Sequence, residues 1–330
     1  MPRWPPTHGA APIGRTAPDI KPNSGDVPIR TISFPTEPTM KISLDCYPCF
    51  LRQALQAGRH VTADETRLKA VLDAVAGEIP RIPPGAASPV IGGIVHRIVR
   101  EIAGDDDPYR RVKAENLAEA QRHYPAMKDH VARSENPMAE AAHLAIVGNI
   151  IDSAVIPECD IEREIFSLAD RPLAVDDTQR LCEALDGASS VLYIGDNVGE
   201  TVFDRVFIEE ITAPVTYVVR DRPVLNDVTV QDALDSGLGG LARILPSGSA
   251  SPGAVLPECS DEFLDLFEKA DVVVSKGQGN YEALSDAPRP IFFLLRAKCP
   301  VVARDLGVEV GSLVLRESHR DPDRPQPFFG

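Results

Sequence analysis

The sequence predicts an α/β protein in which an all-helical N-terminal domain precedes a Rossmann-like domain with three α/β/α layers. Two patterns along the chain support this prediction. Helical periodicity of apolar residues dominates from about residue 45 to 186, where we find no convincing strand. After residue 186, short β-branched runs alternate with amphipathic stretches, as in parallel sheets wrapped by helices. We therefore predict a helical domain at 40–186 and a Rossmann-like domain with a mainly parallel sheet at 187–330.

The N-terminal stretch differs from both predicted domains. Residues 1–39 contain nine prolines and no apolar periodicity, so we expect a disordered, Pro-rich extension. The first structured pattern opens at Met40, which we hypothesise is the natural start of the protein. The N-terminus lacks the basic and then apolar segments of a signal peptide. We therefore expect a cytoplasmic protein.

Four stretches of the first domain have the spacing of apolar side chains that predicts helices. They are residues 49–61, 64–79, 89–104 and 136–155. The third begins with Pro89 and ends near Gly104, which are common residues at helix boundaries. The fourth is strongly apolar, so we expect a buried helix that is interrupted at Gly148 and Asn149.

The second domain contains six short apolar runs that predict strands. They are residues 190–195, 214–220, 243–246, 271–277, 290–296 and 312–317. Amphipathic stretches at 199–212, 228–237 and 261–270 separate several of these runs and predict helices. Residues 246–258 are rich in Pro, Gly and Ser, and the length of this loop suggests a functional lid.

Composition excludes several classes of protein. The chain has 34 basic and 49 acidic residues, a net charge of −15, which disfavours a general nucleic-acid binder. No apolar run is long enough for a membrane span, so we expect no membrane partner. Six cysteines in 330 residues are too few for a disulfide scaffold. A small anionic ligand is still compatible with this composition, since a local site can be positive.

Polar residues follow the predicted strands where a ligand is expected, beyond the carboxyl ends of an open α/β sheet. The first strand ends at Asp196 and Asn197, the second at Arg220, and "DVVVSKG" at Lys276. Asp227 follows Arg220 closely. Oxygen ligands such as those of Asp196, Asn197 and Asp227 suit Mg²⁺ or Mn²⁺ better than zinc.

The cationic and glycine residues of this set indicate a phosphate ligand. Lys276 and Arg220 can hold a phosphoryl group, and Gly277 and Gly279 let main-chain N–H groups approach an anion closely. A hard metal beside these groups suggests phosphoryl transfer or hydrolysis.

Simpler interpretations remain open for each residue alone. Asp196, Asn197 and Asp227 could be helix N-caps, and Lys276 could be a solvated surface lysine. A nicotinamide-dependent enzyme is disfavoured because no G-x-G-x-x-G follows the first strand. A P-loop ATPase is disfavoured because the chain has no G-x-x-x-x-G-K-[ST] run.

Two further pairs of candidate residues lie in the predicted helical domain. Cys46-x-x-Cys49 sits at a helix start, where structural packing is our first interpretation and a second metal site or a redox role is the alternative. Asn149 and Asp152 lie three apart on one apolar helical stretch. Buried there, they would need polar partners, so we expect them to border the site.

Five motifs in this order resemble those of the damage-control phosphatase family, first catalogued as domain of unknown function 89. They are "LDCYPCFLRQAL", "VGNIIDSAV", "GDNVGETVFD", "LNDVTVQDA" and "SKGQGNYEAL". The resemblance covers roughly residues 41–318, and the C-x-x-C is similar to that of the mainly prokaryotic branch. It implies a metal-dependent phosphatase of small phosphometabolites, notably sugar phosphates, with a helical portion joined to a Rossmann-like portion.

The resemblance also implies roles for individual residues. The metal-binding Asp-Asn pair of the family matches Asp196 and Asn197, and its later metal-binding aspartate matches Asp227, with Asp221 as a rival. The lysine–glycine motif near the phosphate matches Lys276 and Gly277. Asn280 and Tyr281 lie near that motif. Asn149 matches an asparagine of the family's helical domain that faces the substrate cleft.

Together these observations predict a phosphomonoester hydrolase that uses one divalent cation, Mn²⁺, Mg²⁺, Co²⁺ or Ni²⁺. Asp196, Asn197 and Lys276 are the expected catalytic residues, and Arg220 and Asp152 join those expected to bind substrate. Attack by a metal-oriented water is preferred to attack by Asp196, since a metal ligand is a poor nucleophile. A non-catalytic nucleotide- or metabolite-binding protein and a C-x-x-C metal or redox protein remain the alternatives, and the sequence leaves the oligomeric state open.

Overall fold

A computed structural model of the chain describes residue 40 and residues 42–83, 85–148 and 161–318. The predicted Pro-rich extension, Asn149 and Asp152 lie outside these residues. The α-helices are α1 (Cys46–Val61), α2 (Glu65–Glu78), α3 (Ser88–Ala103), α4 (Arg110–Arg133), α5 (Pro137–Val147), α6 (Ile161–Ala169), α7 (Thr178–Asp186), α8 (Thr201–Ile208), α9 (Val230–Asp235), α10 (Asp261–Lys269), α11 (Gly277–Leu284) and α12 (Pro300–Leu306).

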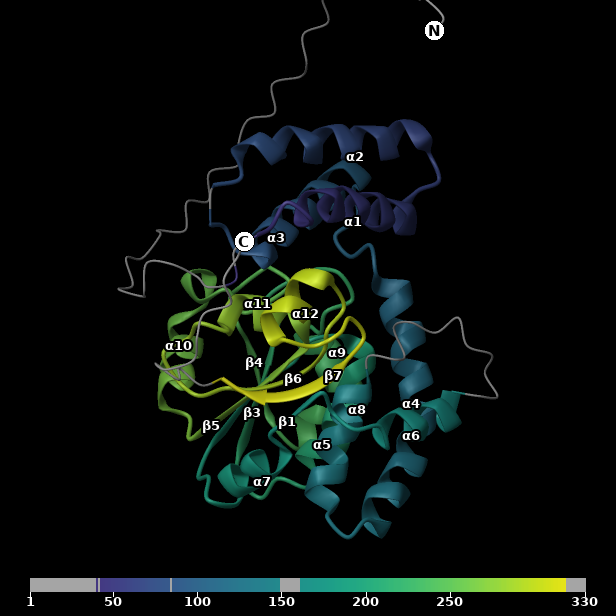
Figure 1. Ribbon diagram of the computed structural model, residues 1–330. Coiled ribbons are helices and arrows are strands. Elements are labelled where there is room, and N and C mark those ends of the chain that lie inside the picture. The colour runs from purple at the N-terminus through teal and green to yellow at the C-terminus, as the bar shows by residue number, and fades with distance from the viewer. Residues whose placement is uncertain (1–39, 41, 84, 149–160, 319–330) are drawn as a thin grey trace, which may run out of the picture. The chain divides into compact units, whose positions relative to one another are not determined.

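Seven strands form one sheet in the order β1-β7-β6-β5-β2-β3-β4 (Figure 1). They are β1 (Val175–Asp176), β2 (Val191–Ile194), β3 (Val215–Val219), β4 (Arg243–Pro246), β5 (Val272–Lys276), β6 (Phe292–Arg296) and β7 (Leu313–Glu317). Neighbouring strands are parallel except β6 and β7, which are antiparallel. The predicted fold class, a mainly parallel sheet with flanking helices, is therefore confirmed.

Strand β1 corrects one detail of the prediction. Val175 and Asp176 pair in parallel with Val314 and Leu315 of β7, although no strand was expected before residue 186. Two residues are too short for an alternating pattern to be visible in the sequence. Residues from the predicted helical domain therefore extend the edge of the sheet.

Helices cover both faces of the sheet because successive side chains of a strand point to opposite sides. In β2, Val191 and Tyr193 belong to a core shared with helices α4 to α9. Leu192 and Ile194 belong to a second core shared with α10, α11 and α12. The two cores give the three α/β/α layers, and every side chain of β2 is buried. Because β2 is packed on both faces, the residues that directly follow it are held in a fixed position.

Helices α1, α2 and α3 form a third apolar cluster, which includes Phe50, Val75 and Val95 (Figure 1). Tyr109, just before α4, belongs to the same cluster. Helix α3 packs against α11, which begins at the end of β5. The three helices thus lie next to the edge of the sheet where the polar residues gather. None of the described helices is long and apolar enough to cross a membrane.

Candidate active site

Asp196, Asn197 and Asp227 are brought together by a main-chain bridge between two strand ends. The segment after β3 turns back beside the segment after β2, so that Val228 N donates to Asp196 O at 2.8 Å and Val198 N to Asn226 O at 2.9 Å. Asn197 and Asp227 consequently lie opposite each other in an isolated antiparallel bridge. All three side chains belong to residues that are at most 7% exposed.

The proximity of these carboxylates changes their acidity. Burial raises the pKa of Asp196 well above its ordinary value, and the negative charges of Asp227 and Glu200 raise it further. Burial also raises the pKa of Asp227, although Arg220 acts in the opposite direction. The folded protein without a cation therefore holds negative charge where it is costly, which is the electrostatic requirement of a cation site.

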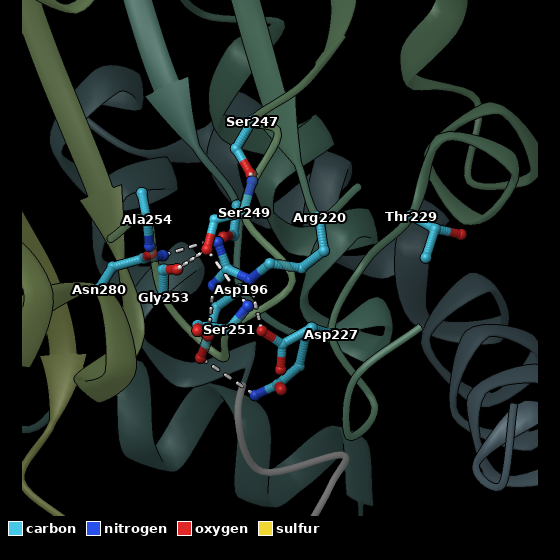
Figure 2. Close-up of polar contacts among 12 residues, drawn as sticks. Asp196, Arg220, Asp227, Thr229, Ser247, Ser249, Ser251, Gly253, Ala254 and Asn280 are labelled. Atoms are coloured by element: carbon cyan, nitrogen blue, oxygen red, sulfur yellow. Dashed lines mark hydrogen bonds and ion pairs between the residues drawn. The ribbon is translucent and has the colours of Figure 1, made fainter. Parts of the chain in front are cut away.

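Arg220 lies between the two carboxylates (Figure 2). Its Nε donates to Asp227 Oδ2 at 2.6 Å, and its Nη2 is 3.6 Å from Asp196 Oδ1. The side chain is fully buried, yet Nη1 and Nη2 have no hydrogen-bond partner among the described residues. Buried N–H donors without a hydrogen-bond partner are costly, so the two Nη atoms are candidates to bind an anion.

Gly277 begins α11 directly against Asp196. Its φ of +76° is a left-handed conformation that favours glycine, and a Cβ added there would lie 1.9 Å from Asp196 Oδ2. Only a residue without a side chain lets the start of α11 approach the carboxylate this closely. The observed conformation of the Asp196 side chain therefore requires glycine at position 277.

The side chain of Lys276 is paired with two buried carboxylates, those of Glu200 and Asp204. Its Nζ donates to Glu200 Oε2 and to Asp204 Oδ1, both at 2.7 Å, and the residue is fully buried. Burial by itself disfavours the ammonium, but the charges of Asp204 and Glu200 outweigh this effect and raise the pKa of Lys276. Lys276 is thus a cation held by two carboxylates, whereas the sequence led us to expect a direct phosphate contact.

The same buried network includes hydrogen bonds from Asn197, Tyr193 and Tyr217. Asp204 also accepts hydrogen bonds from the hydroxyls of Tyr193 and Tyr217, each at 2.7 Å. Glu200 accepts from Asn197 Nδ2 at 3.0 Å. Asn197 Nδ2 therefore points at Glu200, which turns the amide oxygen of Asn197 away from the network.

Two other candidates on α11 have structural partners. Asn280 donates to Gly195 O at 3.0 Å and to Lys276 O at 2.8 Å, and its Oδ1 accepts from Ala254 N at 2.9 Å (Figure 2). It therefore ties the ends of β2 and β5 to the loop after β4. Tyr281 packs on Phe293 and donates to Asp305 Oδ2 at 2.5 Å, on the α12 side of the sheet.

The loop after β4 is a packed wall of the site. Ser247, Ser249 and Ser251 are at most 3% exposed. Ser249 Oγ and Ser251 Oγ both donate to Glu258 Oε2, at 2.7 and 2.8 Å, and Ser249 lies beside Arg220 in Figure 2. The three serines form hydrogen bonds with one another and with Glu258, so this part of the predicted lid is packed in the structure, and its function as a lid stays a prediction.

The remaining candidates are Asp221, Cys46 and Cys49. Asp221 is exposed and pairs with Arg222 at 3.5 Å, so geometry favours Asp227 as the partner of Asp196. Cys46 and Cys49 are half-buried in the first turn of α1 as free cysteines. Burial raises the pKa of the Cys46 thiol, which leaves it protonated and poorly nucleophilic.

The donor set at the strand ends fits a hard cation. In the part of the chain that is described, no group of three or more His, Cys, Asp or Glu side chains is arranged to hold a metal. Mg²⁺ and related ions are commonly held by one or two carboxylates, with substrate and water completing the shell. Two buried carboxylates and one amide oxygen match that requirement.

Comparison with known proteins identifies the family. Residues 42–314 match the model of the damage-control phosphatase ARMT1-like domain. The chain belongs to the damage-control phosphatase family. A damage-control phosphatase of Pyrococcus horikoshii is 36% identical over 284 residues, which cover 83% of this chain and 97% of that protein. A damage-control phosphatase of Archaeoglobus fulgidus is 36% identical over 290 residues, covering 84% of this chain and 99% of its own length.

A solved structure extends the similarity to three dimensions. The crystal structure of a DUF89 family protein from Pyrococcus horikoshii superimposes with a TM-score of 0.80 at 33% identity, covering 85% of this chain and all of that one. An uncharacterized protein of Methanocaldococcus jannaschii is 34% identical over 294 residues, covering 84% of this chain and 95% of its own length. The match therefore spans the helical part, the sheet and the candidate site.

Lys298 is a further candidate for the site that was not predicted from the sequence. It is exposed, it follows β6, and its positive charge lowers the pKa of both Asp196 and Asp227. Its main-chain N–H donates to Gln278 Oε1 at 2.9 Å, which fixes this turn against α11. The strand-end rule that found Asp196 applies equally to the end of β6, and it would have found Lys298 had it been applied there.

Replacing Gly277 by alanine should disrupt the site. The new Cβ would displace the Asp196 carboxylate, and misplacement of a site group by about 1 Å costs on the order of 100-fold in rate. We expect the phosphatase activity of Gly277→Ala to fall by about that factor. The matched control is Gly187→Ala, which has a negative φ and open space around its Cβ position, and which should leave the activity unchanged. Equal activity of both variants would show that Asp196 is not confined by Gly277.

Replacing Asp196 by asparagine should stabilise the protein without a cation. Because the folded-state pKa of Asp196 is raised, the folded state binds the proton more tightly than the unfolded state, and stability falls as pH rises above the ordinary aspartate value. Asp196→Asn removes this loss, so its melting temperature in EDTA should exceed that of the wild type by about 2 °C or more at pH 7.5. The difference should shrink toward pH 4. A lower melting temperature at pH 7.5 would contradict the charge crowding.

Proposed function

We propose that this family member is a divalent-metal-dependent phosphatase that hydrolyses small phosphorylated metabolites, sugar phosphates or related compounds, and so acts in metabolite damage control. The observation that supports this most strongly is the combination of two buried carboxylates with a buried guanidinium whose Nη atoms have no hydrogen-bond partner among the described residues. Such a site attracts a cation and an anion side by side, as a metal-bound phosphate requires.

The cation would be held by Asp196, Asn197 and Asp227. Mn²⁺, Mg²⁺, Co²⁺ or Ni²⁺ at this position would polarise a phosphoryl oxygen and orient the attacking water. The Asn197 side chain uses Nδ2 to donate to Asp196 Oδ2 and to Glu200 Oε1, which leaves its amide oxygen as the proposed ligand. Asp196 acts as a ligand in this arrangement, so water is preferred to Asp196 as the nucleophile.

The phosphoryl group would be bound by Arg220 and Lys298. The Nη atoms of Arg220 supply fixed donors at the base of the site, and Lys298 supplies a mobile charge at its rim. The positive charges of both residues oppose the rise in the pKa of Asp196, which supports their assignment to one anion site.

Lys276 acts in this proposal through other residues. It neutralises Glu200 and Asp204, and Glu200 in turn orients the amide of Asn197. A lysine with two carboxylate partners has little to offer a phosphate, so its role is to position Asn197. Asn280 likewise positions the strand ends and the loop after β4.

The names of the relatives support the reaction class. Two of them, from Pyrococcus horikoshii and Archaeoglobus fulgidus, are damage-control phosphatases. The match covers 97% and 99% of these two relatives, so it includes both the helical part and the sheet of this chain. A small organic phosphate is therefore the proposed substrate. Residues of the helical part would determine which organic group is accepted.

The experiment is phosphate release from a panel of phosphomonoesters, with each of the four cations and with EDTA. The wild type should release phosphate only with a cation, from at least one sugar phosphate and from an aryl phosphate. Lys298→Met should lower kcat/KM by about tenfold, since a charge-assisted hydrogen bond contributes about 1.5–3 kcal/mol when it is well formed. The effect should fall mainly on KM if Lys298 binds the phosphate before reaction.

The matched control is Lys269→Met, an exposed lysine that pairs with Asp265 on α10. It should behave as the wild type. Activity in EDTA equal to that with metal would overturn the metal requirement, and phosphate release from no substrate of the panel would overturn the phosphatase proposal.

A further inference from the structure

Helix α3 contacts the loop after β4 and the segment after β3, which both border the candidate site. Gly92 and Gly93 pack against the loop after β4, where an added Cβ would lie 2.7 Å from Pro252 Cγ and from Ser251 Oγ, respectively. Two turns further on, Arg100 Nη1 donates to Pro223 O, in the segment that carries Asp227. Residues 92, 93, 96 and 100 share one face of a helix, so His96 lies between these two contacts.

The imidazole of His96 has an unpaired polar atom. The residue is 2% exposed, and Nε2 has no hydrogen-bond partner among the described residues. Burial, with the nearby charge of Arg100, lowers the pKa of His96 to about 3, so the ring is neutral. A buried polar atom without a partner costs about 1–3 kcal/mol, and a ligand that supplied the partner would recover this energy.

The surroundings of His96 connect it to the candidate cation site. Its ring lies edge-on to that of Tyr109, with centroids 6.1 Å apart. Tyr109 is buried, and the negative charge of Asp227 contributes to raising the pKa of its hydroxyl. Leu225, two residues before Asp227, has a φ of +49° and packs against the same helical cluster as Tyr109. The helical part and the Asp227 segment are therefore in direct contact at this point.

The backbone of Leu225 supports a functional reading of this contact. A left-handed conformation at a branched residue costs about 1–2 kcal/mol and persists only where the surroundings enforce it. Here it brings the side chain of Leu225 to the helical cluster and leaves Asp227 facing Asn197. The position of α3 is consequently coupled to that of the candidate metal ligands.

We propose that His96 determines leaving-group specificity, with its Nε2 forming a hydrogen bond to a hydroxyl on the organic part of the phosphorylated substrate and the Tyr109 ring forming the adjacent apolar wall. This inference rests on the proposed function and goes beyond it by assigning recognition of the organic part to helix α3. Arg220 and Lys298 recognise the phosphate that all candidate substrates share, whereas His96 distinguishes hydroxylated leaving groups from others.

The test compares two substrates of equal chain length, ribitol 5-phosphate and n-pentyl phosphate, in the wild type and in His96→Leu. We expect the wild type to favour the polyol phosphate by at least tenfold in kcat/KM, because a site built to pair a hydroxyl rejects a ligand that lacks it. His96→Leu should reduce that ratio at least fivefold while changing the rate with n-pentyl phosphate by less than about twofold. His96→Gln should keep part of the ratio.

A second readout separates recognition from a structural role. His96→Leu removes an unpaired buried atom, so its melting temperature without substrate should equal or exceed that of the wild type. The control His143→Leu also removes a histidine of the helical part, but a half-buried one whose Nε2 lies 3.1 Å from Thr178 Oγ1. It should lower the melting temperature and leave the ratio of the two substrates unchanged.

A measurement on the wild-type chain covers the case in which the variants do not fold. In EDTA, ribitol 5-phosphate should shift the ¹⁵N resonance of His96 Nε2, and inorganic phosphate should not. An unchanged substrate ratio in a folded His96→Leu, an equal loss with both substrates, or no selective resonance shift would overturn the inference. Absence of metal-dependent phosphate release by the wild type from ribitol 5-phosphate, from n-pentyl phosphate and from every phosphomonoester of the panel would instead overturn the proposed function.

Discussion

The structure depends on one electrostatic constraint, the burial of the Asp196 and Asp227 carboxylates side by side. Burial and mutual repulsion raise the pKa of Asp196, and Arg220 offsets only part of the cost. The main chain nevertheless enforces the arrangement, through the hydrogen bonds that join the segments after β2 and β3. A fold that holds like charges together in this way stores a free-energy cost that binding of a cation would relieve. The family membership and the phosphate-binding candidates are consistent with that conclusion.

Much of the remaining structure maintains this arrangement. Beneath it, Lys276 with Glu200 and Asp204 forms a network in which the buried charges are paired. Beside it, Gly277 allows α11 to start against Asp196. Above it, the helical part contacts the Asp227 segment and contributes a neutral histidine. The phosphate end and the organic end of a substrate would therefore be read by different parts of the chain, the strand ends and helix α3.

Sequence reasoning was most reliable where a periodic pattern determined position. Alternating apolar runs located the strands, and the strand-end rule then located Asp196, Asn197, Arg220 and Asp227. It was weaker for side-chain direction, because the partners of a side chain come from distant segments. Lys276 follows a strand as expected, but its ammonium donates a hydrogen bond to Asp204 on α8, a partner that the strand pattern does not reveal. Tyr281 follows the same motif, and its hydroxyl is bonded to Asp305. Strand β1 was not predicted because two residues carry no periodicity. His96 was not singled out because a helical pattern of apolar residues does not reveal whether a histidine has a hydrogen-bond partner.

The most direct test of the central claim is the position of a cation in a crystal of the wild-type protein soaked in MnCl₂. The account predicts an anomalous manganese peak within coordination distance of the side chains of Asp196, Asn197 and Asp227, with Arg220 retained beside Asp227. A peak confined to other residues, such as Cys46 and Cys49, would contradict it. So would well-ordered Asp196 and Asp227 carboxylates with no peak between them at a saturating concentration of manganese.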